Sequence, residues 1–308
     1  MDFYSLGFFT FALITLVLYY ATPGRFRWII LLAASCYFYA TFKVACLGIL
    51  ALCTLVAYLA ALGMERFCES FTRKSILIVA LVAQLGVLFV FKYFDFLNVS
   101  MAEILGAGGI SYSPIILNLV VPVGISFYIF QNIGYLTDVY RRNQSAEKHL
   151  GHFALYLCFF PKLLSGPIER AGNFLPQLRE QIGFDAENVT NGLKLVCWGL
   201  FKKMVIADRL AAFVNVVYAD PQAYSGVSLT MACVFYSFQI YCDFSGYTDI
   251  AIGLGQMFGL KLTDNFNRPY SATSVADFWR RWHISLSSWL RDYLYIPLGG
   301  NRVGPWRH

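Results

Sequence analysis

The sequence predicts an all-α membrane protein with several spans, and two observations carry this prediction. Hydrophobic residues make up 58% of the 308 residues, and charged residues make up 14%. The mean hydropathy is +0.56. Soluble globular domains contain about 25% charged residues, whereas a helix that crosses a bilayer needs about 20 mainly apolar residues. Several apolar runs approach that length, so the chain is expected to fold within lipid.

The first part of the chain, residues 1–142, predicts a scaffold of spanning helices. The apolar runs that predict these spans are residues 3–20, 28–42, 44–62, 76–91 and 115–136. The first run follows an acidic start, Met1-Asp2, whereas a signal peptide begins with a basic stretch. It is therefore expected to remain as a helix.

Basic residues in the short loops predict the orientation of these spans. The positive-inside rule places the side with more Lys and Arg in the cytoplasm. One side carries Lys43 and Lys92, and the other carries a larger set: Arg25, Arg27, Arg66, Arg73, Lys74, Arg141, Arg142 and Lys148. The larger set is expected in the cytoplasm, which puts the N-terminus outside.

Charge and cysteine usage exclude several other classes of protein. The net charge of +6 suits basic loops beside anionic lipid headgroups, and no nucleic-acid-binding motif accompanies it. The eight cysteines are scattered, without a C-x-x-C pair or a histidine at ligand spacing. Neither a metal site nor a disulfide framework is predicted.

The second part, residues 143–308, predicts broken and amphipathic helices. The apolar runs at 153–164, 193–206 and 229–241 are shorter than a comfortable span, and prolines, glycines or lysines interrupt or end them. Broken helices at membrane depth are tolerated where protein or a water-filled cavity covers the freed backbone groups. This part is therefore expected to line a cavity.

Two carboxylates, Asp243 and Asp249, directly follow the 229–241 run. An intramembrane carboxylate usually pairs with a cation. The simplest predicted partners are Arg280, Arg281 or Arg291. Structural pairing is the favoured reading, and direct participation in chemistry is the alternative.

Residues 277–295 predict one amphipathic helix that begins after a Ser274 cap. Aromatic residues recur on one face, and His283 recurs with Arg280 on another. A lone histidine in such a helix is more often structural than catalytic. Flanking arginines would favour its neutral form, and a neutral imidazole suits a general base.

Five blocks of sequence, in order, resemble the membrane-bound O-acyltransferase family. They are residues 127–141, 160–168, 243–249, 265–270 and 277–301. Within that family they most resemble the bacterial branch that O-acetylates alginate and other exported polysaccharides. The resemblance covers nearly the whole chain, and the ordered set is far more specific than any single block.

The resemblance implies a single helical domain over residues 1–308, built around a central tunnel in the bacterial inner membrane. It implies transfer of an acyl group, most simply acetyl, to hydroxyls of an exported polysaccharide or to a periplasmic or extracellular partner acetyltransferase. The donor would be a cytoplasmic thioester, acetyl-CoA or an acyl carrier protein, with no bound cofactor. His283 matches the family's first histidine and is expected to act as tunnel base or donor positioner. Arg280 and Arg281 would orient it, with Asp243 and Asp249 in support.

The family's second histidine belongs to a Leu-Trp-His-Gly type motif that this sequence does not contain. His308 lies in a different context, Gly-Pro-Trp-Arg-His, and is assigned no role. The sequence is therefore expected to be C-terminally incomplete and to lack the family's closing helices.

Three alternatives stay open at this level. The nearest is transfer of D-alanine to teichoic acid by a related enzyme. A noncatalytic membrane scaffold for polysaccharide export would need no tunnel base. A secondary transporter would also place charges at broken helices, but it usually shows inverted halves, and no corresponding segments are found here.

Overall fold

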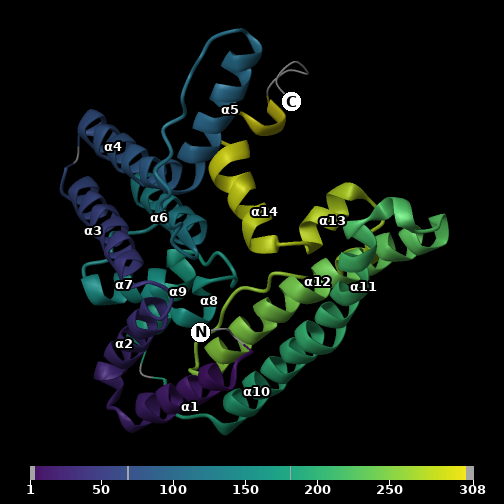
Figure 1. Cartoon of the computed structure of the whole chain (residues 1–308). Coiled ribbons are helices and arrows are strands. Elements are labelled where there is room, and N and C mark those ends of the chain that lie inside the picture. The colour runs from purple at the N-terminus through teal and green to yellow at the C-terminus, as the bar shows by residue number, and fades with distance from the viewer. Residues whose placement is uncertain (1–3, 68, 181, 303–308) are drawn as a thin grey trace. The chain divides into compact units, whose positions relative to one another are not determined.

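The computed structural model describes residues 4–67, 69–180 and 182–302, and every regular element in these ranges is a helix (Figure 1). This confirms the all-α class. Met1, whose side of the membrane was predicted from the basic loops, and His308 lie outside the described residues.

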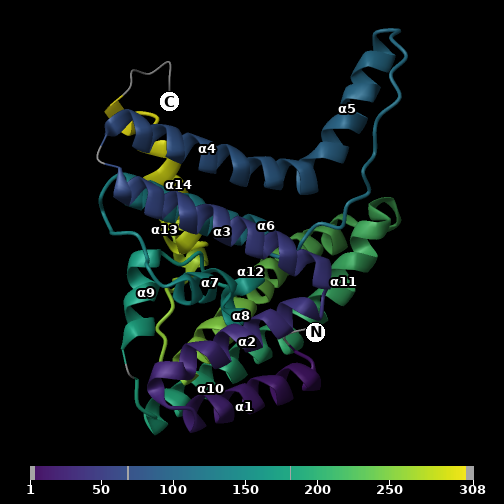
Figure 2. The same ribbon diagram turned by 90° about the vertical axis from the view of Figure 1, so that its left-hand side faces the viewer.

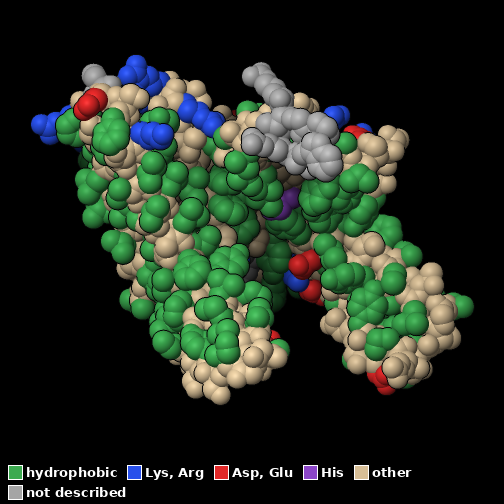
Figure 3. Space-filling view, turned by 90° about the horizontal axis from the view of Figure 1, so that it is seen from above, with side chains coloured by type: hydrophobic (Ala, Val, Ile, Leu, Met, Phe, Trp, Pro, Cys, Tyr) green, Lys and Arg blue, Asp and Glu red, His purple; other side chains and the backbone are tan. Residues whose placement is uncertain are grey.

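Three of the described helices are long and apolar enough to cross a membrane: Val44–Arg66, Ser70–Ala107 and Gly226–Met257. Leu6–Ala21 is a shorter apolar helix. Hydrophobic side chains also cover much of the face seen in Figure 3, and many large hydrophobic side chains are exposed. Apolar surface of this extent is typical of contact with lipid, so the chain is a polytopic membrane protein.

The chain divides into two compact units. Unit 1 comprises Met1–Leu31, Phe159–Glu169 and Pro176–His308, and unit 2 comprises Leu32–Cys158 and Arg170–Leu175. Helices α2 (Arg27–Ala40) and α9 (Ala171–Arg179) contain residues of both.

Unit 2 is built on three helices that lie side by side, α3 (Val44–Arg66), α4 (Ser70–Leu88) and α6 (Ile125–Tyr140) (Figure 2). A π-helical turn, Phe89–Tyr93, continues α4 into α5 (Phe94–Ala107), and α7 (Leu150–Cys158) packs against α3. Buried amides tie the bundle together. Gln84 donates to the Cys53 carbonyl at 2.8 Å, and Asn132 donates to Gln84 at 3.3 Å.

The predicted span 115–136 is wrong at its beginning, because α6 starts at Ile125. Residues 110–122 form no regular element. Pro114 and Pro122 remove backbone donors and restrict the residues before them. The segment is held instead by Asp95, whose carboxylate accepts from the backbone N–H groups of Leu117 at 2.8 Å and Asn118 at 3.1 Å.

Unit 1 is dominated by α12 (Gly226–Met257), against which α10 (Ala186–Leu200) and α11 (Asp208–Ala219) pack (Figure 1). A π-helical turn joins α10 to α11, so the run at 193–206 belongs to a longer helix, and the run at 229–241 lies within α12. The run at 153–164 is broken as predicted, because α7 ends at Cys158 and α8 covers only Phe160–Leu163. The remaining helices of this unit are α1 (Leu6–Ala21), α8 (Phe160–Leu163), α13 (Val275–Arg281) and α14 (Ile284–Leu290). Short 3₁₀ and π turns lie at Gly24–Phe26, Phe201–Ala207, Pro221–Ala223, Pro269–Ser271, Arg291–Tyr295 and Gly300–Arg302.

Paired glycines allow α10 and α12 to approach closely. A side-chain carbon added at Gly192 would lie 2.5 Å from the Gly253 carbonyl oxygen, and one added at Gly199 would lie 2.6 Å from that of Gly246. Such contacts are far shorter than van der Waals separation. Small residues at these positions are therefore required for the two backbones to touch.

Gly199→Ala is expected to lower the stability of the protein by about 1–3 kcal/mol, because the added methyl group must push two backbones apart. The measurement is the midpoint of thermal unfolding of the purified full-length protein. Gly48→Ala in α3 is the matched control, since nothing lies within 4 Å of the added carbon. Equal midpoints for the two variants would contradict the close approach of α10 and α12.

Candidate active site

His283 lies at a break in the chain and not within a continuous helix. Helix α13 ends at Arg281 and α14 begins at Ile284, and His283 between them has a left-handed backbone, with φ of 43°. The predicted single helix over 277–295 is therefore wrong. Its Ser274 cap is confirmed, because the Ser274 hydroxyl accepts from the Asp277 N–H at 3.1 Å.

Backbone pairing with an earlier loop explains the break. The Ile284 N–H donates to the Asn265 carbonyl at 2.9 Å, and the Asn267 N–H donates to the Arg281 carbonyl at 2.9 Å. The backbone groups on either side of His283 thus bond to residues 265–267, and they do not continue a helix. This pairing presents the imidazole to the loop.

The Asn265 side chain determines the tautomer of His283. Its Oδ1 lies 3.0 Å from His283 Nδ1 and also accepts from the Ser285 backbone N–H at 3.1 Å and the Ser285 hydroxyl at 2.9 Å. A backbone N–H can only donate, so the amide atom at this place is the oxygen. His283 Nδ1 must then carry the proton, which leaves Nε2 with a lone pair.

The environment of the imidazole favours its neutral form. The ring is half-buried and meets the Phe244 ring edge to face, with centroids 4.8 Å apart. Burial lowers the pKa of His283 from 6.5 to about 4. The shift has the direction expected from the sequence, but its cause is loss of water and not the flanking arginines. His283 is therefore neutral at pH 7.

Several of the sequence blocks converge on His283. The Ile168 N–H donates to the Ser285 hydroxyl at 3.0 Å, which connects the 160–168 block to the Asn265 network. Next to it, the buried Glu169 carboxylate accepts from the Thr263 backbone N–H and, at 3.0 Å, from the Thr263 hydroxyl. Phe244 brings the 243–249 block to the same ring. Four segments distant in sequence thus build one site in unit 1.

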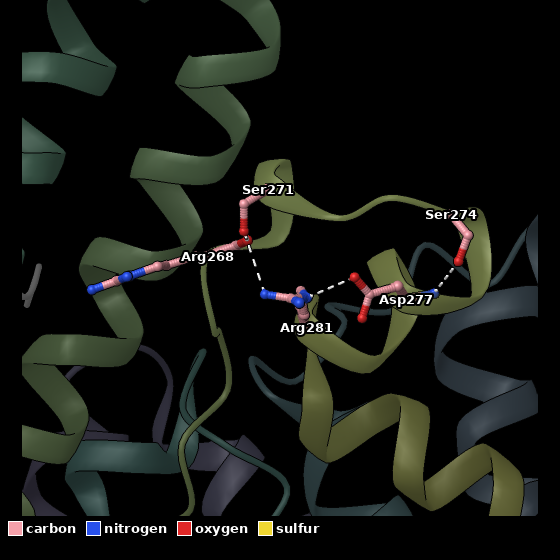
Figure 4. Close-up of polar contacts among 5 residues, drawn as sticks. All are labelled: Arg268, Ser271, Ser274, Asp277 and Arg281. Carbon is pink, nitrogen blue, oxygen red and sulfur yellow. Dashed lines mark hydrogen bonds and ion pairs between the residues drawn. The ribbon is translucent and has the colours of Figure 1, made fainter.

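The predicted orienting residues lie elsewhere. Arg281 Nε bonds the Asp277 carboxylate at 3.0 Å, and its Nη1 donates to the Ser271 hydroxyl at 3.3 Å (Figure 4). That hydroxyl donates to the Arg268 carbonyl at 2.8 Å. Arg281 therefore braces the turn before α13, and Arg280 is exposed.

The predicted pairing of Asp243 and Asp249 with arginines is wrong. Asp249 lies 2.6 Å from Lys202, and Asp243 lies 2.5 Å from Lys203. Arg291 pairs with its neighbour Asp292 at 2.7 Å. The π-helical turn between α10 and α11 carries both lysines to α12. These carboxylates hold α12 to that turn, and neither has a contact with the imidazole among the described interactions.

Comparison with known proteins identifies the family. The family model of the MBOAT, membrane-bound O-acyltransferase family, matches residues 34–305. The chain belongs to this family. It is 39% identical over 96% of its length to "Probable alginate O-acetylase AlgI" of Azotobacter vinelandii, and 37% identical over 92% of its length to a peptidoglycan O-acetyltransferase of Helicobacter pylori. A teichoic acid D-alanyltransferase of Bacillus subtilis is 30% identical over 58% of this chain and 46% of its own length.

The chain spans 58% of the length of both the Azotobacter and the Helicobacter relatives.

Sequence reasoning missed Asn265 and Ser285 as functional residues. Both are polar residues within the blocks that carry the family resemblance, which was the available signal. Their roles depend on two loops meeting at the same carboxamide oxygen, and no spacing along the chain predicts that meeting.

Among the described residues, no group of three or more His, Cys, Asp or Glu side chains converges as metal ligands. The arrangement around His283 instead offers one neutral, oriented imidazole. Such a group can accept a proton from a hydroxyl or hold a substrate by hydrogen bonding.

Proposed function

We propose that this chain forms part of a membrane O-acyltransferase in which His283 serves acyl transfer to a hydroxyl group. One observation carries the proposal: the Asn265 carboxamide oxygen holds the Nδ1 proton of His283, so that Nε2 is free to accept another. Membership of the acyltransferase family supports the same reading.

The chemistry follows from this orientation. Nε2 takes the proton of the acceptor hydroxyl as its oxygen attacks the thioester carbonyl. The new C–O bond forms, the C–S bond breaks, and the thiolate leaves and recovers a proton. The Asn265 oxygen stabilises the positive charge that appears on the imidazole. General base catalysis of this kind contributes about 10²–10⁴ in rate.

The donor and acceptor follow the relatives. We assign a cytoplasmic acyl thioester, acetyl-CoA or an acyl carrier protein, as donor and an envelope polysaccharide hydroxyl, or a periplasmic or extracellular partner transferase, as acceptor. The names of the alginate and peptidoglycan relatives both specify O-acetylation. The site would act in the bacterial inner membrane, with the N-terminus outside and the basic loops in the cytoplasm.

D-alanyl transfer to teichoic acid is the second candidate, supported by the Bacillus subtilis relative. It uses the same bond changes with a different acyl group. A noncatalytic scaffold is the remaining alternative.

One experiment separates these functions. Cells producing the full-length protein, or its His283→Gln variant, are grown, and the esters on their purified envelope polysaccharide are released with mild base. Acetate from wild-type cells, strongly reduced in the variant, is the expected result. D-alanine in place of acetate would assign the second candidate. Unchanged ester content in a stably inserted His283→Gln protein would overturn a role of His283 in transfer.

A further inference from the structure

A buried arginine in unit 2 has no anionic partner among the described residues. Arg73 in the first turn of α4 is 8% exposed. Its Nη2 donates to the Tyr140 carbonyl at 2.9 Å and the Val139 carbonyl at 3.2 Å, and its guanidinium lies over the Tyr140 ring at 5.8 Å. These contacts cap the C-terminus of α6. They do not neutralise the charge.

Two features show that Arg73 is incompletely satisfied. Its Nε is buried without a hydrogen-bond acceptor. In the described part of the chain no carboxylate forms an ion pair with it, Glu65 nearby included. An uncompensated buried charge costs several kcal/mol. A residue in this state is well suited to an anion that comes from outside the chain.

A cavity of about 580 Å³ adjoins Arg73 within unit 2. Its polar lining comprises Glu65, Arg73, Arg142, Asn143, Gln144 and Ser145. Gln144 carries a second buried donor, Nε2, without an acceptor. Arg142 is exposed and has a left-handed backbone, with φ of 63°. Two incompletely satisfied donor groups and a second guanidinium therefore border one space.

We propose that this cavity binds a phosphate-bearing anion. Phosphate oxygens accept several hydrogen bonds at once, and arginine binds them through its planar fork of donors. Small side-chain movements would bring Arg73 Nε and Gln144 Nε2 to such oxygens. Glu65 would confine the anion to the arginine side of the cavity.

The position in the fold suggests two sources of this phosphate. The cavity lies where α3 ends, α4 begins and α6 ends. Both α3 and the α4–α5 helix are long enough to cross a membrane, so this end of unit 2 is expected near lipid headgroups. Basic pockets between spanning helices bind anionic headgroups. An anionic phospholipid and a soluble phosphate share the chemistry that the cavity recognises.

The test uses the purified full-length protein to compare these two sources of phosphate. Its thermal midpoint is measured in phosphatidylcholine nanodiscs, then with added phosphatidylglycerol, and separately with inorganic phosphate against chloride at equal ionic strength. Stabilisation by phosphatidylglycerol alone assigns a lipid headgroup, and stabilisation by inorganic phosphate assigns a soluble ligand. Absence of both effects overturns the proposal.

Variants show whether the cavity is responsible. Arg142→Gln and Gln144→Leu are expected to weaken binding of the effective anion, the former by about tenfold for one lost charge-assisted bond. Both avoid the α6 cap that Arg73→Gln would remove. Lys74→Gln is the matched control, because Lys74 is exposed, carries the same charge as Arg142 and lies outside the cavity lining. Equal weakening by Lys74→Gln and Arg142→Gln would show diffuse surface attraction and overturn the proposed site.

Discussion

Replacing His283 with alanine in the full-length protein is expected to lower acyl transfer by about 10²–10⁴-fold, the range that a general base contributes. The reason is geometric. Nδ1 is committed to Asn265 at 3.0 Å, so Nε2 is the only ring nitrogen left to accept a proton. The measurement is the initial rate of transfer of a labelled acetyl group in membranes, normalised to the amount of inserted protein.

A control variant and the pH dependence of the rate test this prediction further. Ser288→Ala, on the short helix α14 that follows His283, removes a hydroxyl that donates to the Ser285 carbonyl at 3.0 Å, and the rate of this variant should stay near wild type. The wild-type rate should not fall with the ordinary histidine pKa of 6.5 as pH decreases, because burial keeps His283 neutral until about pH 4. A His283→Ala protein with a near-normal rate would exclude both the base and the positioning role.

Replacing Lys202 with methionine is expected to destabilise the protein by about 3–5 kcal/mol, because it leaves a carboxylate buried without its partner. Lys202 and Asp249 are 2.6 Å apart, with side chains 9% and 20% exposed, and Lys202 also donates to the Ser245 hydroxyl at 3.0 Å. The lysine is on the π-helical turn after α10 and the carboxylate on α12. Thermal unfolding and the yield of monodisperse protein measure the loss.

The double variant Lys202→Met/Asp249→Leu should recover much of that stability, since apolar groups can replace a buried ion pair at little cost. Arg291→Gln breaks a pair in which the arginine side chain is 62% exposed, and exposed pairs contribute about 0–1 kcal/mol. If Lys202→Met were as mild as Arg291→Gln, the Lys202–Asp249 pair would not hold the turn to α12.

Hydropathy determined the class of this protein because burial in lipid depends on composition within a short run. The runs at 44–62 and 76–91 correspond to α3 and α4, and the helices differ from the predicted runs only at their ends. The run at 115–136 failed in its first ten residues. Apolar composition cannot distinguish a helix from an irregular segment that Asp95 holds through its backbone N–H groups.

The sequence by itself determined the membrane class, the family and His283 as the residue to examine, because these depend on composition and on the order of motifs. Only the tertiary structure decided what surrounds His283. The helix break follows from backbone bonds to residues 265–267, and the tautomer follows from a carboxamide oxygen shared with Ser285. The cation for Asp249 comes from a helix more than forty residues away in sequence. These partners depend on which backbone segments pack together in the folded protein, and the periodicity of a local stretch of sequence does not specify that packing.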